Sequence, residues 1–150
     1  KGMWLAGGAS NTGGAVIRAY FPDERLAELS AQLDPDAPTG LNYYPLLHPG
    51  ERFPVSDAKL APRLEPRPRD DATFFQGILE GIAAIEKEGY ERLAELGAPH
   101  LKSVRSVGGG ASNAAWTRIR QRLIGVPFEA AASVEAAAGT ARLAYGAVSS

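Results

Sequence analysis

The segment from Gly108 to Trp116 holds the groups best suited to binding a ligand. Its consecutive glycines let a ligand approach the backbone more closely than a residue with a Cβ would allow. The helix expected after them presents N–H groups and the positive end of its dipole, which favour a phosphate. Asn113 and Trp116 lie three residues apart on one helix face, where a carboxamide can hydrogen-bond an adenine edge and an indole can stack on the base. The segment predicts a nucleotide site at Gly108, Gly109, Gly110, Asn113 and Trp116.

The same residues also have structural interpretations. Trp116 is followed by Ile119 and Leu123 at helical spacing, so it can equally be a core aromatic. Ser112 is the better candidate for the N-cap of the helix, and Asn113 would then be an ordinary residue of the helix terminus. Either role can coexist with ligand binding, and the sequence leaves both open.

Alternating helices and short strands are expected to position this segment. Besides the helix after Gly110, apolar spacing predicts helices over 12–20, 23–33, 71–96 and 134–147, and strands over 2–6, 41–46, 103–107 and 127–131. Most of the 11 prolines lie between residues 35 and 68, which predicts an irregular excursion over 34–69. Gly77 and Gly81 lie one turn apart inside the longest helix, which predicts a close contact with another element. The alternation favours an α/β layered fold in one domain, residues 1–150.

Composition narrows the class of protein. The chain has 150 residues, 45% of them hydrophobic, and a formal net charge of −1, as expected for one soluble globular domain. The absence of cysteine excludes disulfides and thiol chemistry, and the only histidines, His48 and His100, are expected to be solvated in turns. No apolar run reaches the length of a membrane span, so no membrane partner is expected. Because Met3 falls inside a predicted strand, we expect the chain to be a fragment.

The other charged residues are interpreted as structural. Asp70 and Asp71 stand where the longest helix should begin, and Asp57 lies in the proline-rich excursion. Two basic stretches lack interleaved aromatic residues, and their side chains are expected to be solvated: Arg63, Arg67, Arg69, Arg118, Arg120 and Arg122. In a chain of nearly neutral charge, this pattern argues against a nucleic-acid partner.

Three well-known loop motifs are rejected. The glycine-rich stretch that ends at Gly14 lacks the lysine of a P-loop. Neither Ser10 nor Ser112 is followed two residues later by the glycine of a nucleophile elbow. The glycines at 108–110 lack the third glycine of a dinucleotide fingerprint.

The pentapeptide Gly-Gly-Ala-Ser-Asn occurs twice, at 7–11 and at 109–113. Three residues after its asparagine, the second copy has Trp116, whereas the first has Gly14, which cannot stack on a base. We therefore assign nucleotide contact to the second copy and a packing or hinge role to the first.

Five segments, in order along the chain, resemble the C-terminal part of the FGGY carbohydrate kinase family: 5–15, 44–54, 76–83, 108–116 and 135–139. The resemblance implies the second lobe of an actin-like, ribonuclease-H-like ATPase fold, incomplete at its N-terminal side. In that family the glycine turn holds the phosphate end of the nucleotide and the asparagine meets the base, so Gly109, Asn113 and Trp116 inherit those roles. The triple glycine with Asn and Trp is more similar to ribulose and xylulose kinases than to glycerol kinases.

The resemblance also implies a reaction, in which ATP with Mg²⁺ phosphorylates a ketose such as D-ribulose or D-xylulose. The expected partners are an adenine nucleotide, the N-terminal lobe of the same cytoplasmic kinase, and a sugar held mainly by that lobe. The aspartate base and the metal contacts would also lie upstream, so no catalytic or metal-binding residue is assigned here, and the chain alone is expected to be inactive. The alternative is a non-catalytic nucleotide-binding or assembly module of the same fold.

Overall fold

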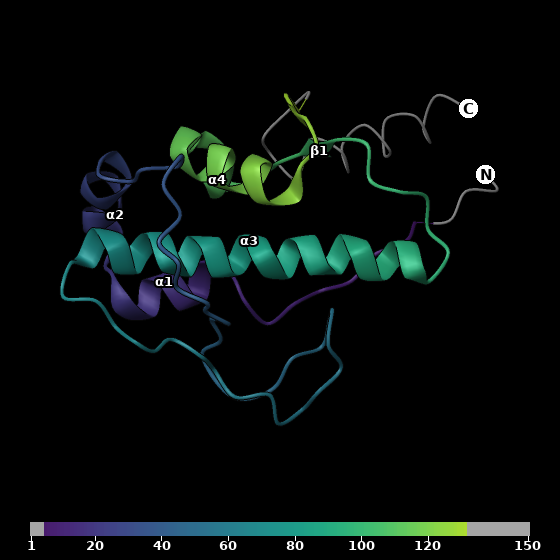
Figure 1. Ribbon diagram of the computed structural model, residues 1–150, viewed down its shortest axis with the longest axis horizontal. Helices are drawn as coiled ribbons and strands as arrows, with labels where there is room; N and C mark the ends of the chain where they lie inside the picture. Colours follow the sequence, from purple (N-terminus) through teal and green to yellow (C-terminus); the bar gives the residue numbers. More distant parts are fainter. Residues whose placement is uncertain (1–4, 132–150) are drawn as a thin grey trace, which may run out of the picture.

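A computed structural model describes residues 5–131 of the chain. In order, its elements are α1 (Gly14–Tyr20), α2 (Asp23–Ala31), α3 (Asp71–Glu95), β1 (Val104–Arg105), the 3₁₀ turn η1 (Gly109–Ser112), α4 (Ala114–Ile124) and β2 (Phe128–Glu129). In the view of Figure 1, α3 crosses the molecule, with α4 along its upper side and α1 along its lower side. The two strands pair in parallel, with Val104 opposite Phe128.

The predicted helices over 12–20, 23–33 and 71–96 are confirmed within a few residues, and the expected strands at 103–107 and 127–131 are present in shorter form. The strand predicted over 41–46 is wrong, because Tyr44 makes only an isolated antiparallel bridge with Arg63 and the proline that follows it cannot donate to a ladder. Leu5 and Ala6 are not in a strand, and the rest of that prediction over 2–4, like the helix over 134–147, lies outside the described residues. The described part is mainly helical, with one small parallel sheet.

Both ends of α3 carry strong local signals. At its start, the carboxylate of Asp70 accepts hydrogen bonds from the backbone N–H and the hydroxyl of Thr73, at 2.7 and 2.6 Å. At its end, Gly97 adopts a left-handed φ of 96° and its N–H donates to the carbonyl of Ala94. These caps explain why a helix of 25 residues begins and ends where the sequence predicts.

The hydrophobic core forms around the first half of α3. Phe74 and Ile78 of this helix are fully buried, together with Val16 of α1, Leu29 of α2 and Ile119 of α4. The ring of Phe74 meets three aromatic rings edge-on, at centroid distances of 5.2, 6.1 and 5.8 Å, from Tyr20, Phe21 and Tyr43. Every other helix of the described chain thus buries apolar side chains in a core centred on α3.

Gly77 and Gly81 make the close contact that their spacing predicts. A Cβ at position 77 would lie 2.7 Å from a methyl group of Leu41, and one at position 81 would lie 2.9 Å from the carbonyl oxygen of Tyr43 and 2.9 Å from Cδ of Pro45. The proline-rich excursion therefore lies directly on the backbone of α3. The two glycines lower the intrinsic helix propensity, and this close packing is the compensation.

Buried polar groups hold the start of the excursion between α3 and α4. The carboxylate of Glu80 accepts hydrogen bonds from the backbone and hydroxyl of Thr39 and from the guanidinium of Arg122, which lies 2.8 Å away. The side-chain amide of Gln76 donates to the carbonyls of Asp34 and Ala37. Together these bonds fix residues 34–39 against the two helices.

The expectation that the arginines of 118–122 form a solvated face is wrong for two of them. The side chain of Arg120 is only 11% exposed and pairs with Glu86 at 2.6 Å, while Arg122 pairs with Glu80. Arg118 keeps the expected exposure and pairs with Asp36 at 2.7 Å. Arg120 and Arg122 occupy positions of α4 that face α3. Their charges can be buried there because Glu86 and Glu80 of α3 pair with them.

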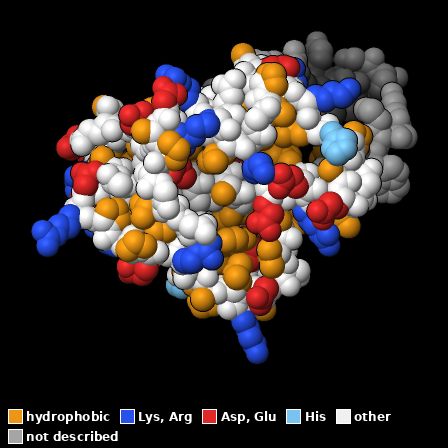
Figure 2. Space-filling view, in the orientation of Figure 1, with side chains coloured by type: hydrophobic (Ala, Val, Ile, Leu, Met, Phe, Trp, Pro, Cys, Tyr) orange, Lys and Arg blue, Asp and Glu red, His pale blue; other side chains and the backbone are white. Residues whose placement is uncertain are grey.

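Acidic and basic side chains are interspersed over the face of the molecule drawn in Figure 2. Many of them form exposed ion pairs, such as Arg25 with Asp71 at 3.0 Å and Lys87 with Glu91 at 2.6 Å. Exposed pairs of this kind contribute roughly 0–1 kcal/mol each. The stability of the fold therefore depends on the core and on the buried polar contacts.

Replacing Gly81 with alanine should destabilise the protein, although alanine is the better helix former. The new Cβ would overlap the backbone of Tyr43, and we expect a loss of about 1–3 kcal/mol in the free energy of unfolding. Urea denaturation followed by circular dichroism measures this. Gly14→Ala is the control, since its Cβ would meet only the guanidinium of Arg18 at 4.0 Å. A Gly81→Ala variant as stable as the wild type would contradict the close contact.

Candidate functional site

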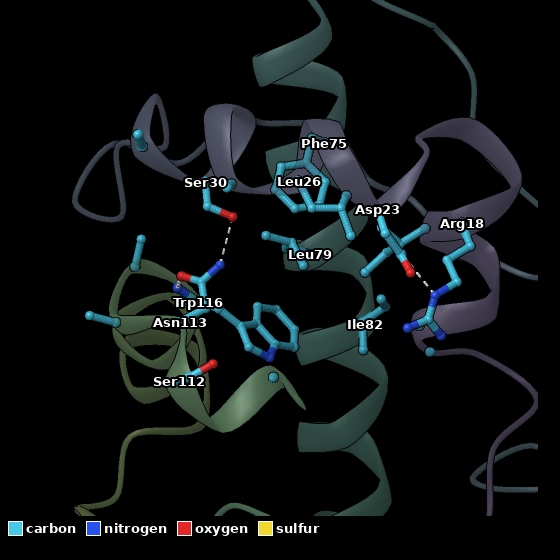
Figure 3. Close-up of a pocket in the computed structure, with 18 residues that line it drawn as sticks. Arg18, Asp23, Leu26, Ser30, Phe75, Leu79, Ile82, Ser112, Asn113 and Trp116 are labelled. Carbon is cyan, nitrogen blue, oxygen red and sulfur yellow. Dashed lines mark hydrogen bonds and ion pairs between the residues drawn. The ribbon is translucent and has the colours of Figure 1, made fainter. Parts of the chain in front are cut away.

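A cleft of about 940 Å³ lies between two walls that rest on α3. Residues of α1 and α2 form one wall, residues 110 and 112–116 form the other, and Phe75, Leu79 and Ile82 of α3 form the floor. Figure 3 shows these elements converging on the cavity. The lining is mainly apolar with a few polar groups, which is the usual character of a small-molecule site.

The structure brings three of the predicted site residues together at this cleft: Gly110, Asn113 and Trp116 all line it. Gly108 has a φ of 84°, which favours glycine, and turns the chain into η1. Gly109 is the first residue of that 3₁₀ turn. Gly108 is not among the described residues that line the cleft.

Asn113 is the N-cap of α4, so the expectation that Ser112 caps this helix is wrong. The carboxamide oxygen of Asn113 accepts a hydrogen bond from the backbone N–H of Trp116 at 2.9 Å, because the backbone of Asn113 has the extended conformation of a cap. The amide nitrogen donates to the hydroxyl of Ser30 on α2, also at 2.9 Å. Asn113 thus links the two walls of the cleft, as the dashed line in Figure 3 shows.

Trp116 packs as the core aromatic that its spacing predicts and also lies at the cleft. It is partly buried, packs against the core, and also lines the cleft, where its indole projects toward α3 (Figure 3). Gly110 lies against the indole edge, since a Cβ there would be 3.2 Å from Nε1. The guanidinium of Arg120 lies 5.6 Å from the centre of the Trp116 ring and is held by Glu86. The indole is therefore held in place by contacts within the protein.

Gly13 and Gly14, which follow the first copy of the repeated pentapeptide, line the opposite wall. Gly13 has a φ of 131°, so it starts α1 with a turn that favours glycine. The predicted packing or hinge role concerns the first copy itself, residues 7–11, and not the two glycines that follow it. No local signal marks these two glycines as cavity-lining residues, because the first copy of the repeat, residues 7–11, ends before them and is not among the described residues that line the cleft. At the rim, Arg18 and Asp23 form an exposed ion pair at 2.9 Å.

A buried carboxylate anchors the loop in front of Gly13. Glu51, in the proline-rich excursion, is 3% exposed. It accepts hydrogen bonds from the Ser10 hydroxyl at 2.6 Å, from the backbone N–H groups of Asn11 and Arg52 at 2.7 and 2.8 Å, and from the Tyr44 hydroxyl at 3.2 Å. Arg52 also donates to the side chain of Asn11 at 2.7 Å. The packing role predicted for the first repeat thus applies to Ser10 and Asn11.

These contacts change the ionisation of the groups involved. Burial alone would raise the pKa of Glu51, but the hydrogen bonds from Ser10, Asn11, Arg52 and Tyr44 outweigh it and hold the pKa below its ordinary value. Burial, followed by the charge of Glu51, raises the pKa of the Tyr44 hydroxyl. Glu51 is therefore a stable anion at neutral pH, and Tyr44 remains a neutral donor.

A comparison with protein families matches residues 1–148 to the C-terminal domain of the FGGY family of carbohydrate kinases. The chain belongs to this family. FGGY kinases are phosphotransferases that use ATP with a divalent metal ion. Their C-terminal domain implies an actin-like ATPase fold, with which the helices and the small parallel sheet of residues 5–131 are compatible.

Across residues 5–131, no three His, Asp or Glu side chains gather to hold a metal ion. None of the helices in this range combines the length and apolarity needed to cross a membrane.

The remaining candidate acids and bases of the FGGY domain have structural surroundings. Asp70 caps α3, and Asp71 pairs with Arg25 and Arg67, which lowers the pKa of its carboxyl. A side-chain oxygen of Asp57 accepts a hydrogen bond from the backbone of Lys59 within a loop. His48 and His100 are exposed, as predicted.

Replacing Glu51 with glutamine should destabilise the FGGY domain in a pH-dependent way. At pH 7 we expect a loss of about 1–3 kcal/mol, since the amide would turn an N–H group toward buried donors. A lowered pKa in the folded state stabilises the protein above the ordinary value of 4.5, and this contribution disappears as the pH falls through the folded pKa. The difference between wild type and variant should therefore shrink below about pH 4.5.

Urea denaturation between pH 3 and pH 7 measures this difference. The matched control is Glu24→Gln, which neutralises an exposed carboxylate of α2 and should change stability by less than about 0.5 kcal/mol. A difference that stayed constant with pH would show that the charge of Glu51 does not contribute to stability.

Proposed function

We propose that this chain supplies the adenine-nucleotide site of an ATP-dependent carbohydrate kinase that phosphorylates a ketose, such as D-ribulose or D-xylulose. The observation that carries the proposal is the meeting of Gly110, Asn113 and Trp116 at one wall of the cleft in an FGGY C-terminal domain. The triple glycine followed by Asn and Trp supports a ketose kinase within the family.

Each residue has a role that its surroundings support. Asn113 uses one N–H and one lone pair within the protein, which leaves one of each for the edge of an adenine. Trp116 offers its indole to the face of the base. The turn formed by Gly108, Gly109 and Gly110 lets the phosphate end approach the backbone, and the start of α4 favours its negative charge.

The reaction transfers the γ-phosphoryl group of ATP to a hydroxyl of the sugar, and the proton of that hydroxyl passes to an aspartate base. We place this base and most of the sugar contacts in an N-terminal lobe of the same kinase, so this chain alone is inactive. The described residues hold no donor cluster suited to Mg²⁺, and we assign no metal contact to them. The contribution of this chain is to position the nucleotide, which is a large part of phosphoryl-transfer catalysis.

A calorimetric titration with ADP tests the nucleotide site. Trp116→Ala should weaken ADP binding by roughly 1–3 kcal/mol, about 5- to 150-fold, because the base loses its stacking partner. Trp116→Phe should retain much of the affinity, since it keeps an aromatic face. Asn113→Asp should keep the cap of α4, because aspartate caps a helix as well as asparagine, and should still weaken binding through the lost amide donor.

Circular dichroism and urea denaturation show whether each variant is folded. The exposed Leu96, which is 66% accessible, provides the control Leu96→Ala outside the cleft. Unchanged ADP affinity in folded Trp116→Ala and Asn113→Asp would overturn the proposed site. A kinase assay with both lobes present, with D-ribulose and D-xylulose as acceptors, separates the ketose kinase from a non-catalytic nucleotide-binding module.

A further inference from the structure

The hydrogen bond between Asn113 and Ser30 joins residues 83 positions apart in the chain. Ser30 lies in the last turn of α2 and lines the same cleft as Asn113. Figure 3 shows the Ser30 hydroxyl directed at the carboxamide across the end of the cavity. This contact ties the wall formed by α2 to the start of α4.

The network allows only one orientation of the Asn113 carboxamide. The backbone N–H of Trp116 can only donate, so the carboxamide oxygen must face it. The amide nitrogen then faces Ser30 and gives one of its two N–H groups to that hydroxyl. One N–H and one oxygen lone pair of Asn113 remain available to a ligand.

Contacts outside the cleft also hold α2 and α4 relative to each other. The partly buried guanidinium of Arg122 donates to the carbonyl of Pro35 at 2.5 Å, and the exposed pair of Arg118 with Asp36 at 2.7 Å adds a weaker contact. Both partners lie in the loop that follows α2. Ser30 therefore faces Asn113 across an interface that contacts outside the cleft also hold, and its hydroxyl accepts a hydrogen bond from the carboxamide.

We infer that Ser30 is a positioning residue that makes the site selective for adenine over guanine nucleotides. This inference rests on the proposed function, in which Asn113 meets the base. Adenine offers a ring-nitrogen acceptor beside an amino donor, which matches the free N–H and the free lone pair of Asn113. Guanine offers two neighbouring acceptors, N7 and O6, which require two N–H groups. Because Ser30 occupies one N–H of Asn113, only one is free, and guanine is disfavoured.

Ser30→Ala tests this inference by calorimetric titration of the protein with ADP and, separately, with GDP. Without the serine hydroxyl, Asn113 keeps its bond from Trp116 but loses one of the two hydrogen bonds that hold its carboxamide, and ADP should bind about two- to tenfold more weakly. The second N–H of Asn113 also becomes free, so the preference for ADP over GDP should fall. Ser30→Thr keeps the hydroxyl and should restore both the affinity and the preference, which a general effect on stability would not do.

The double variant Ser30→Ala with Asn113→Ala distinguishes the possible failures. If Asn113→Ala alone leaves ADP binding unchanged, the proposed nucleotide role of Asn113 fails, and the inference about Ser30 fails with it. If Asn113→Ala weakens ADP binding but Ser30→Ala changes neither the affinity nor the preference, only the inference is overturned. It is also overturned if Ser30→Ala has the same effect with and without Asn113, whereas loss of the Ser30→Ala effect in the double variant supports it.

Discussion

The close approach of residues 41–45 to the backbone of α3 is the constraint on which the cleft depends. Side chains at positions 77 and 81 would fill the space that this segment occupies. With the segment in place, the carbonyl of Pro45 accepts the hydroxyl of Thr12 at 2.6 Å, and the excursion returns to bring Glu51 onto the backbone of Asn11. Gly13 and Gly14, which line the cleft, come directly after Thr12 in the chain, so this anchored loop positions them. The proline-rich excursion thus supports one wall of the cleft without lining it.

The opposite wall is supported by partly buried ion pairs. Burying a charge is costly, and a buried pair offsets that cost only when the remaining donors and acceptors are also satisfied. Here Arg120 donates to Glu86 and also to the Ser106 hydroxyl, and Arg122 donates to Glu80 and also to a backbone carbonyl. Each guanidinium is a planar fork that fits its partners in one arrangement. The pairs therefore fix how α4 sits on α3, and with it the direction in which Trp116 points.

The sequence predicted the parts of the molecule that local signals determine. The long helix α3, the glycine turn and the placement of Asn113 and Trp116 near one another all follow from caps, periodicity and spacing within a few residues. The parts that it did not predict depend on partners far along the chain. Glu51 contacts Asn11 across 40 residues of the chain, and Arg120 contacts Glu86 across 34. Because these partners are so far apart, no local sequence pattern marks either side chain as buried. Ser30 carries no local signal at all, because its role exists only through Asn113.

The interior of the cleft and its rim differ in how firmly they are held. Asn113 is fixed by two hydrogen bonds, and Trp116 is confined by the core, by Gly110 and by Arg120. The entropy of ordering these side chains is lost on folding, so a ligand that contacts them does not lose it again. The Arg18 and Asp23 side chains at the rim are 66% and 62% exposed, and such a pair is weak enough to rearrange around a ligand. We therefore expect selection between ligands to depend on the Asn113–Ser30 contact that joins the two walls, while the rim adapts to the bound ligand.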